Sequence, residues 1–341
     1  MDQEACRRCK GGYLIAALLV ALSSGISAAW GAAEEIVGVW DLTTNGTGWQ
    51  ALGTLSIAKN ADGTLTGKWG SVDLSNVKFE DHQKLTFVRL VRAGDVAFSG
   101  TLTDGTLTLS DTRGGKVTGV PRKPKTPVLG QWDLKCDVEG LVVPVRLVVS
   151  QRPGAAPEAK WITNFAQTVI WNVKIEGDKL TLSQETTFEN ATFESSLEGT
   201  VRGHALTGTV RSPLGNLPIT GQRIGVALIG KWELKLATPQ GQRTHVLTID
   251  TDLTGRYERP ETFGGEVPIK DLKLDGDRAS FKTEVNLGDR TDVTECKFTL
   301  DGKTLKGQSA SERGIVELTG RKVESMPSPT RPGSPSQAGA G

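Results

Sequence analysis

A basic residue followed directly by an aromatic residue occurs at three widely spaced places in the chain. The pairs are Lys68-Trp69, Lys160-Trp161 and Arg256-Tyr257. A flat ring with a polar neighbour suits the wall of a site for a small apolar or sugar-like ligand, and the cation could orient an acidic group on that ligand. These six residues are therefore the candidate ligand-binding residues. The alternative is that the aromatics fill a core while the basic side chains extend along its surface.

No catalytic motif accompanies these pairs. The sequence contains no Gly-rich phosphate loop, no HExxH, no Gly-x-Ser-x-Gly and no paired CxxC after the first ten residues. His82 and His204 fall in turn-like segments and His245 in an expected strand, so no two histidines are near each other in sequence. Asp and Glu are spread over turns and outward strand positions, as on solvated faces. The sequence predicts no catalytic residue, no metal, no cofactor and no enzymatic activity.

The N-terminal segment has the order of a secretory signal peptide. Arg7, Arg8 and Lys10 precede an apolar run over residues 13–22, and small residues follow. The run is shorter than the roughly 20 residues that span a bilayer. We expect residues 1–33 to act as a signal that is removed after Ala29 or Ala33. The protein would then be exported to the periplasm or outside the cell, with no membrane span left.

Cysteine use leaves two alternatives open. Cys6 and Cys9 would leave with the signal, so Cys136 and Cys296 remain. A disulfide is compatible with an exported protein. The other interpretation is that both are small buried apolar residues, since they fall in different repeats.

The charge balance excludes one class of partner. The chain has 40 Lys and Arg residues against 39 Asp and Glu residues. A nucleic-acid-binding protein should carry a basic excess or stripe. We therefore expect no nucleic-acid partner, and expect a monomer that binds a small molecule or a protein.

One unit recurs three times along the chain. A Gly-x-Trp-Asp/Glu-Leu motif occurs at 38–42, 130–134 and 230–234. Each copy continues with an alternating apolar segment, the basic-aromatic pair, a Gly- or Asp-containing turn, and a closing Thr-Gly followed by a basic residue. The repeats are predicted over residues 36–123, 129–223 and 229–322.

The pattern within each repeat predicts short antiparallel strands. Apolar residues alternate over runs of five to eight, and turn residues interrupt them every 8–12 residues. Closure into a barrel removes the exposed edges of such a meander. We therefore predict an all-β protein of three tandem antiparallel meander barrels, each with about eight strands.

The Gly-x-Trp on the first strand, with a basic residue closing the last, resembles the lipocalin and calycin group of small barrels. It is most similar to the short lipocalin-like domains of uncharacterised exported bacterial proteins. The resemblance implies that a cation lies over each Trp at the closed end of the barrel. The implied pairs are Trp40 with Arg122, Trp132 with Arg223, and Trp232 with Arg321 or, in its place, Lys322.

The linkers differ in composition. Residues 120–127 contain three prolines, which favour a stiff spacer, whereas residues 224–229 are apolar. Because an exposed apolar linker is costly, we expect the second and third repeats to pack together and the first to stand apart. Residues 324–341 are rich in Pro, Ser and Gly and are expected to be disordered.

Three functions follow from this architecture. The first is an exported non-enzymatic binding protein for a small apolar or sugar-like ligand. The second is a structural or interaction spacer with filled barrels and no ligand. The third is a hydrolase or isomerase with a site in one barrel mouth, which requires inward-facing ionisable residues in one copy only; the sequence comparison identifies no such copy.

Overall fold

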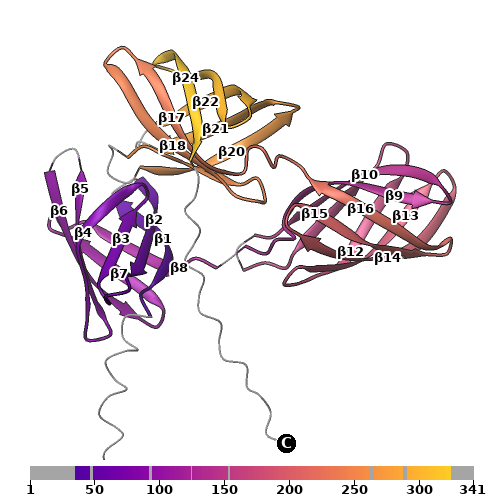
Figure 1. Cartoon of the computed structure of the whole chain (residues 1–341), viewed down its shortest axis with the longest axis horizontal. Helices are drawn as coiled ribbons and strands as arrows, with labels where there is room; N and C mark the ends of the chain where they lie inside the picture. Colours follow the sequence, from indigo (N-terminus) through magenta and orange to yellow (C-terminus); the bar gives the residue numbers. More distant parts are fainter. Residues whose placement is uncertain are drawn as a thin grey trace, which may run out of the picture.

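The described residues of the protein are all β. A computed structural model describes residues 35–323 except 47–48, 92–93, 124, 153, 261–264 and 287–289. These residues form 24 strands and no helix, and every pairing is antiparallel (Figure 1). The predicted all-β class is confirmed, and the predicted sets of eight antiparallel strands close fully in two cases and nearly close in the third. The predicted signal segment 1–33 and tail 324–341 lie outside the described residues.

The first eight strands form a closed barrel, because β1 pairs with both β2 and β8 and every strand between pairs with its neighbours in sequence. Their bounds are β1 Gly38–Gly46, β2 Trp49–Lys59, β3 Leu65–Trp69, β4 Val72–Glu80, β5 Lys84–Val91, β6 Gly94–Thr103, β7 Thr106–Asp111 and β8 Lys116–Pro121.

The last eight strands also close, because β17 pairs with both β18 and β24. Their bounds are β17 Gly230–Thr238, β18 Gly241–Ile249, β19 Gly255–Glu258, β20 Glu266–Asp275, β21 Arg278–Asn286, β22 Thr291–Asp301, β23 Thr304–Ser311 and β24 Gly314–Val323.

The middle eight strands nearly close. β9 pairs with β10 and β16, but the sheet ends at β11 on one side and at β12 on the other. Their bounds are β9 Gly130–Val138, β10 Leu141–Ser150, β11 Glu158–Ile162, β12 Gln167–Glu176, β13 Lys179–Phe188, β14 Ala191–Arg202, β15 Ala205–Ser212 and β16 Gly215–Arg223.

The Gly-x-Trp motif builds the same end-cap on each set of eight strands. Each Trp indole donates a hydrogen bond to the backbone carbonyl four residues earlier, at 2.8–3.0 Å, and that earlier residue is a fully buried aliphatic. The glycine has a positive φ of 123–144°, which side-chain-bearing residues rarely adopt. The cap therefore requires the glycine, and it consists of Ile36 with Trp40, Val128 with Trp132 and Leu228 with Trp232.

Close packing against the first strand explains the glycine of the closing Thr-Gly. A Cβ added to Gly119, Gly221 or Gly320 would lie 2.3–2.8 Å from a leucine side chain. That leucine is the last residue of the Gly-x-Trp-x-Leu motif on the neighbouring strand, namely Leu42, Leu134 or Leu234. The last strand can therefore approach the first closely only where glycine leaves room.

The structure confirms some of the cation–Trp pairs that the resemblance implies and contradicts others. Arg223 lies 4.1 Å from the Trp132 ring centroid, and Lys322, the alternative residue, lies 5.5 Å from that of Trp232. The pairing with Arg321 is wrong, because Arg321 lies on the outer face and forms an ion pair with Glu233.

The pairing of Trp40 with Arg122 is also wrong. Pro121 stands opposite Trp40 in the ladder, in the place where Arg223 stands opposite Trp132. Arg122 is one residue further along, and its side chain binds Asp41. The intervening proline therefore shifts the basic residue from the inside of the barrel to the outside.

The expectation that the first repeat stands apart is wrong as well. β2 pairs with β20 through Leu52 and Glu266, which joins the β1–β8 and β17–β24 barrels. Figure 1 shows the β9–β16 strands extending to one side of both, and the end of β16 contacts the β17–β24 barrel where Arg223 donates to the carbonyl of Thr251. The apolar linker 224–229 does not require the second and third sets to pack together, because Leu228 is fully buried in the β17–β24 core and Gly225 lies against Leu253 and Leu274.

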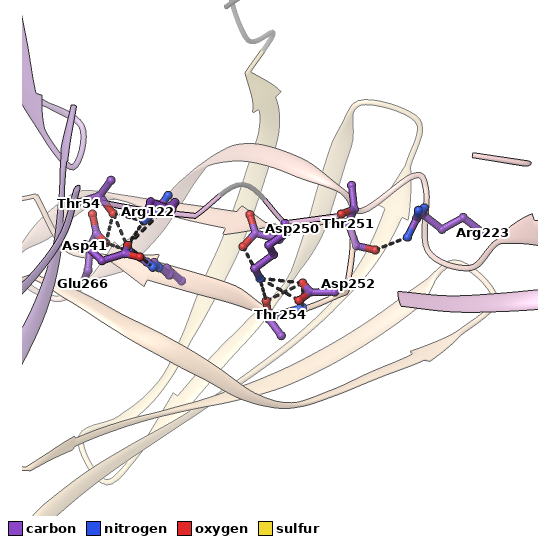
Figure 2. Close-up of polar contacts among 11 residues, drawn as sticks. Asp41, Thr54, Arg122, Arg223, Asp250, Thr251, Asp252, Thr254 and Glu266 are labelled. Atoms are coloured by element: carbon purple, nitrogen blue, oxygen red, sulfur yellow. Dashed lines mark hydrogen bonds and ion pairs between the residues drawn. The ribbon is translucent and has the colours of Figure 1, made fainter. Parts of the chain in front are cut away.

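Polar side chains add to the contact between the β1–β8 and β17–β24 barrels, which we call the junction (Figure 2). Asp41 accepts hydrogen bonds at 2.7 Å from Arg122 and from Arg256, and Thr54 donates to Glu266 at 2.8 Å. Of these three contacts, the Asp41–Arg256 and Thr54–Glu266 contacts tie β1 and β2 to β19 and β20, and Arg122 holds Asp41 in place from the segment after β8.

Other contacts come from Ser71, which donates two hydrogen bonds to Glu258 of β19, and from the linker and the middle strands. Lys125 binds Asp250 and Asp252 at 2.9 Å each, in the turn after β18. Arg223 at the end of β16 donates to the carbonyl of Thr251 at 2.9 Å in the same turn (Figure 2). The turn after β18 therefore contacts both the linker that follows β8 and the end of β16.

Candidate functional site

The structure separates each predicted basic-aromatic pair. Trp69 and Tyr257 are buried inside their barrels, and Trp161 is partly buried against the core of the β9–β16 sheet. Neighbouring residues on a strand point to opposite faces. Lys68, Lys160 and Arg256 therefore lie on the outside.

The outward cations have surface roles. Lys68 pairs with Asp73 at 3.0 Å, and Lys160 is exposed. Arg256 belongs to the junction, where it pairs with Asp41 at 2.7 Å and Glu266 at 3.4 Å. The aromatic member of each pair is the one placed toward a barrel interior.

The interior of the β1–β8 barrel is filled around Trp69. Its ring centroid lies 6.2 Å from that of Phe87 and 5.0 Å from that of Phe98. The guanidinium of Arg89 lies 4.8 Å from the Trp69 centroid. Trp69 is thus packed between rings on one side and a buried cation on another.

One interior position is polar in every strand set. Arg89, Gln184 and Thr283 each stand two residues after a core residue of β5, β13 or β21, and all three are buried. Each has a buried side-chain atom without a hydrogen-bond partner: Nε and Nη1 of Arg89, Oε1 of Gln184 and Oγ1 of Thr283. Unpaired buried polar atoms are uncommon and costly in folded proteins. Each strand set therefore places one polar side chain above the aromatic layer, and the chemistry of that side chain differs from set to set.

The β17–β24 barrel has a cavity at this level that includes the predicted aromatic. The cavity has a volume of about 410 Å³, and Tyr257 is part of its wall. Its other lining residues are Leu236, Thr238, Pro239, Gln240, Arg243, His245, Arg259, Asp292, Thr294, Ser309, Ser311, Arg313, Gly314 and Val316. Most of these residues occupy alternate, inward-facing positions at one end of β17–β19 and β22–β24. The cavity is thus the open mouth of the barrel, opposite the Trp232 cap.

A His–Tyr pair lies on the wall of this mouth. His245 Nδ1 and the hydroxyl of Tyr257 are 2.7 Å apart, and the two rings meet edge to face with centroids 5.3 Å apart. Burial raises the pKa of Tyr257 far above its ordinary value of 10.0, so the phenol stays protonated. The pair therefore presents a fixed, neutral phenol to the cavity.

Cys296 lies near the same wall. Burial raises the pKa of its thiol to about 11, and Sγ lies 3.7 Å from the Ser309 hydroxyl. Cys136 and Cys296 are both buried and free, so of the two interpretations left open, the structure favours small buried residues. The ladder places Cys296 opposite Phe281, where the first barrel has Phe98 opposite Phe87.

Charged side chains are part of the lining of the mouth. Among the described residues, these are Arg243, Arg259, Arg313 and Asp292, and Asp292 lies 3.8 Å from Arg313. The sequence comparison missed this cluster because it matched positions that the three copies share. The signal was the strand period: His245 and Arg243 stand two and four residues before Leu247, and therefore on its inward face.

The described part of the chain shows no group of three or more His, Cys, Asp or Glu side chains that could hold a metal ion. It also has no helix of the length and apolar character needed to cross a bilayer. Comparison with protein-family models and with curated proteins finds no match to this chain.

Proposed function

We propose that the protein is an exported, non-enzymatic binding protein built from three tandem lipocalin-like barrels, and that its ligand site is the mouth of β17–β24. The observation that carries the proposal is the 410 Å³ cavity there. Sites for small molecules in proteins are typically concave spaces of about 300–1,000 Å³ with a few convergent polar groups in an apolar wall.

The division of labour among the barrels supports this assignment. Trp69 is enclosed by two phenylalanines and Arg89, so the β1–β8 barrel serves as a scaffold that holds the third barrel through the junction. Tyr257, the matching aromatic of β17–β24, is instead part of the cavity wall, and its hydroxyl is 2.7 Å from His245 Nδ1. Of the six predicted residues, Tyr257 is thus the one in a position to contact a ligand in this site.

The chemistry of the mouth favours binding over catalysis. A hydrolase or isomerase in one mouth requires ionisable inward residues in a single copy, and β17–β24 has them. Burial nevertheless keeps both Tyr257 and Cys296 protonated at neutral pH, and the thiolate is the nucleophilic form of cysteine. Neutral donors of this kind orient a ligand without attacking it.

A second candidate is the spacer function. The filled interior of β1–β8 favours it for that barrel. If all three sets served only as spacers, the mouth of β17–β24 would bind no small molecule. A substitution that fills this mouth would then change no binding.

A matched pair of substitutions tests the proposed site. Ser311 and Ser212 end equivalent strands, and each hydroxyl accepts a hydrogen bond from the backbone N–H two residues later, at 3.2 Å. Ser311 lines the cavity. Ser311→Trp should abolish the binding and thermal stabilisation given by members of a panel of small lipids, sugars and aromatic acids, whereas Ser212→Trp should not. Equal losses in both variants, or no binding by the unmodified chain, would remove the proposal.

Export is tested separately. The chain expressed with residues 1–33 should be recovered outside the cytoplasm, and its intact mass should correspond to cleavage after Ala29 or Ala33. Recovery of the uncleaved chain in the cytoplasm would contradict export without touching the binding site.

A further inference from the structure

We infer that the mouth of β9–β16, the end opposite its Trp132 cap, docks on the surface of a zwitterionic lipid bilayer. This surface is separate from the proposed ligand site, because it belongs to another strand set. Three features carry the inference: the apolar side chains at the tips of the turns, the direction in which this mouth points, and the charge of its turns.

Every turn at the mouth of β9–β16 carries an exposed large apolar side chain. In an antiparallel meander alternate turns lie at the same end. The turns at this mouth are 139–140, 163–166, 189–190 and 213–214. Phe165 and Leu214 lie within these turns, and Leu141 and Phe188 directly adjoin them. Their exposed fractions are 51% for Phe165, 63% for Leu214, 68% for Leu141 and 42% for Phe188, and we call these four residues the rim.

The exposed apolar side chains of this strand set are concentrated at the mouth. Within β9–β16, every exposed large apolar side chain except Trp171 lies in one of these turns or within three residues of one. The described turn residues at the closed end include only Gln, Arg, Gly, Ala, Pro, Asp and His. Phe165 and Phe188 also contact each other edge to face, with ring centroids 6.1 Å apart. Exposed apolar groups gathered in this way mark sites of interaction with a protein or a membrane.

The rim points away from the two closed barrels. At the closed end of the set, Arg223 contacts the turn after β18 through the carbonyl of Thr251. Figure 1 shows the β9–β16 strands extending to one side from this contact. The rim is at the far end of these strands, so the described strands of the closed barrels leave it uncovered.

The shape of the rim favours a bilayer over a second copy of the chain. A stable protein interface buries about 800 Å² on each partner, over about 20–30 residues of matching shape. The rim instead consists of separate side chains on four turns of two to four residues, arranged around an opening. A bilayer surface is deformable, so all four tips can enter it together, and their apolar area is then removed from water.

The charge of the turns specifies the kind of bilayer. The structure describes every residue of the four turns, and the ionisable ones are Glu139 and Glu189. Two copies joined rim to rim would bring the carboxylates of both copies together, and an anionic membrane surface would repel them. The outermost group of a phosphatidylcholine headgroup is a quaternary ammonium, whose charge is opposite to theirs. A phosphatidylcholine surface therefore suits both the apolar tips and the carboxylates beside them.

Sedimentation with vesicles tests the inference. The chain is used without its signal segment 1–33, so that the apolar run of residues 13–22 cannot contribute. It should sediment with vesicles of phosphatidylcholine, and added salt should not release it. Replacing part of the phosphatidylcholine with phosphatidylserine should weaken the binding. The inference is overturned if phosphatidylcholine vesicles do not bind the chain, or if binding requires phosphatidylserine.

Two variants and a matched control assign the binding to the rim. Leu141→Ser and Leu214→Ser should each weaken binding to phosphatidylcholine vesicles about tenfold, which is the effect of removing one buried leucine side chain. Leu90→Ser is the control, because Leu90 is 63% exposed, as Leu214 is, but lies on β5 of the first barrel. It should leave the binding unchanged. Thermal unfolding checks that each variant remains folded.

Three further results would overturn the inference. Equal weakening in Leu90→Ser would show that exposed leucines in general, and not the rim, attract the vesicles. Unchanged binding in both rim variants would place the contact elsewhere on the chain. A dimer in analytical ultracentrifugation without lipid, dissociated by Leu214→Ser, would make the rim a contact between two copies. None of these results bears on the proposed ligand site, which the Ser311→Trp variant tests.

Discussion

The closed ends of the three strand sets are alike, and their mouths are not. At every closed end, an indole donates to the carbonyl four residues earlier and a leucine fills the space over a glycine. At the mouths, the corresponding buried position holds arginine, glutamine or threonine, and only β17–β24 adds His245 and Arg243 next to its aromatic. What recurs is what each unit needs to fold, and what differs is where separate tasks can reside.

The largest expected effect is a loss of stability on removing the Trp cap, which all three strand sets share at their closed ends. Trp132→Ala removes a fully buried indole, its hydrogen bond to Val128 and its contact with Arg223. We expect a loss of about 3–5 kcal/mol in the free energy of unfolding of the β9–β16 unit, measured by denaturant titration. Trp171→Ala, at a side chain that is 36% exposed, is the control and should cost less than about 1 kcal/mol. Similar losses at both positions would mean that the cap has no special role.

The second prediction tests the glycine under the leucine. A Cβ at Gly221 would lie 2.3 Å from Leu134 Cδ2 and 2.7 Å from a backbone oxygen, so Gly221→Ala should destabilise the β9–β16 unit by about 1–3 kcal/mol. At Gly199, in the same sheet, the nearest atom would be 3.4 Å away. Gly199→Ala should therefore be nearly neutral in the same denaturant titration. The explanation of the Thr-Gly motif fails if the two alanine variants are equally stable.

The third prediction concerns the junction between the closed barrels. Burial acts to raise the pKa of Asp41, but its hydrogen bonds and charge interactions with Arg122 and Arg256 outweigh burial and lower it. The stabilisation by Asp41 is thus present above the ordinary carboxyl pKa of 3.8 and is lost as pH falls through the lower pKa of the folded state.

Asp41→Asn should accordingly weaken the joint unfolding of β1–β8 and β17–β24 by about 1 kcal/mol at pH 7, and by progressively less as the pH falls below about 4. Differential scanning calorimetry across this range measures the difference. A deficit that stays constant with pH would show that the ion pairs do not hold the junction.

The smallest expected effect is a gain in stability, and it concerns Glu258 at the junction. Glu258 is 7% exposed and accepts hydrogen bonds from the backbone and hydroxyl of Ser71. Burial raises its pKa, so its contribution to stability is greatest at low pH and is lost as pH rises through that pKa.

Glu258→Gln keeps an acceptor and removes the buried charge. It should stabilise the junction by less than about 1 kcal/mol at pH 8, and the gain should shrink toward pH 4, where the carboxyl is protonated. Calorimetry of the two proteins at both pH values measures it. A destabilised glutamine variant at pH 8 would show that the ionised carboxylate is required, for example to balance Arg89.

Much of the fold followed from local pattern, whereas the candidate site did not. The alternation, the turns and the Gly-x-Trp motif depend on neighbours within one unit, so they could be predicted from the sequence. The displacement of Arg122 by Pro121 depends on a one-residue register, and the β2–β20 contact depends on surfaces that no local pattern encodes. The mouth was missed because His245, Arg243 and Arg259 have no equivalents in the other copies, and comparison among copies finds only what they share.

The central claim is that the mouth of β17–β24 is the functional end of the molecule. Residue-resolved NMR of the whole chain, titrated with a member of the panel of small lipids, sugars and aromatic acids that the unmodified chain binds, tests it most directly. The account predicts shift changes at the inward residues of β18, β19, β22 and β23 around His245 and Tyr257, with the Trp40, Trp132 and Trp232 caps unchanged. Changes centred on Trp69, on Trp161 or on a cap, or no changes at all, would contradict it.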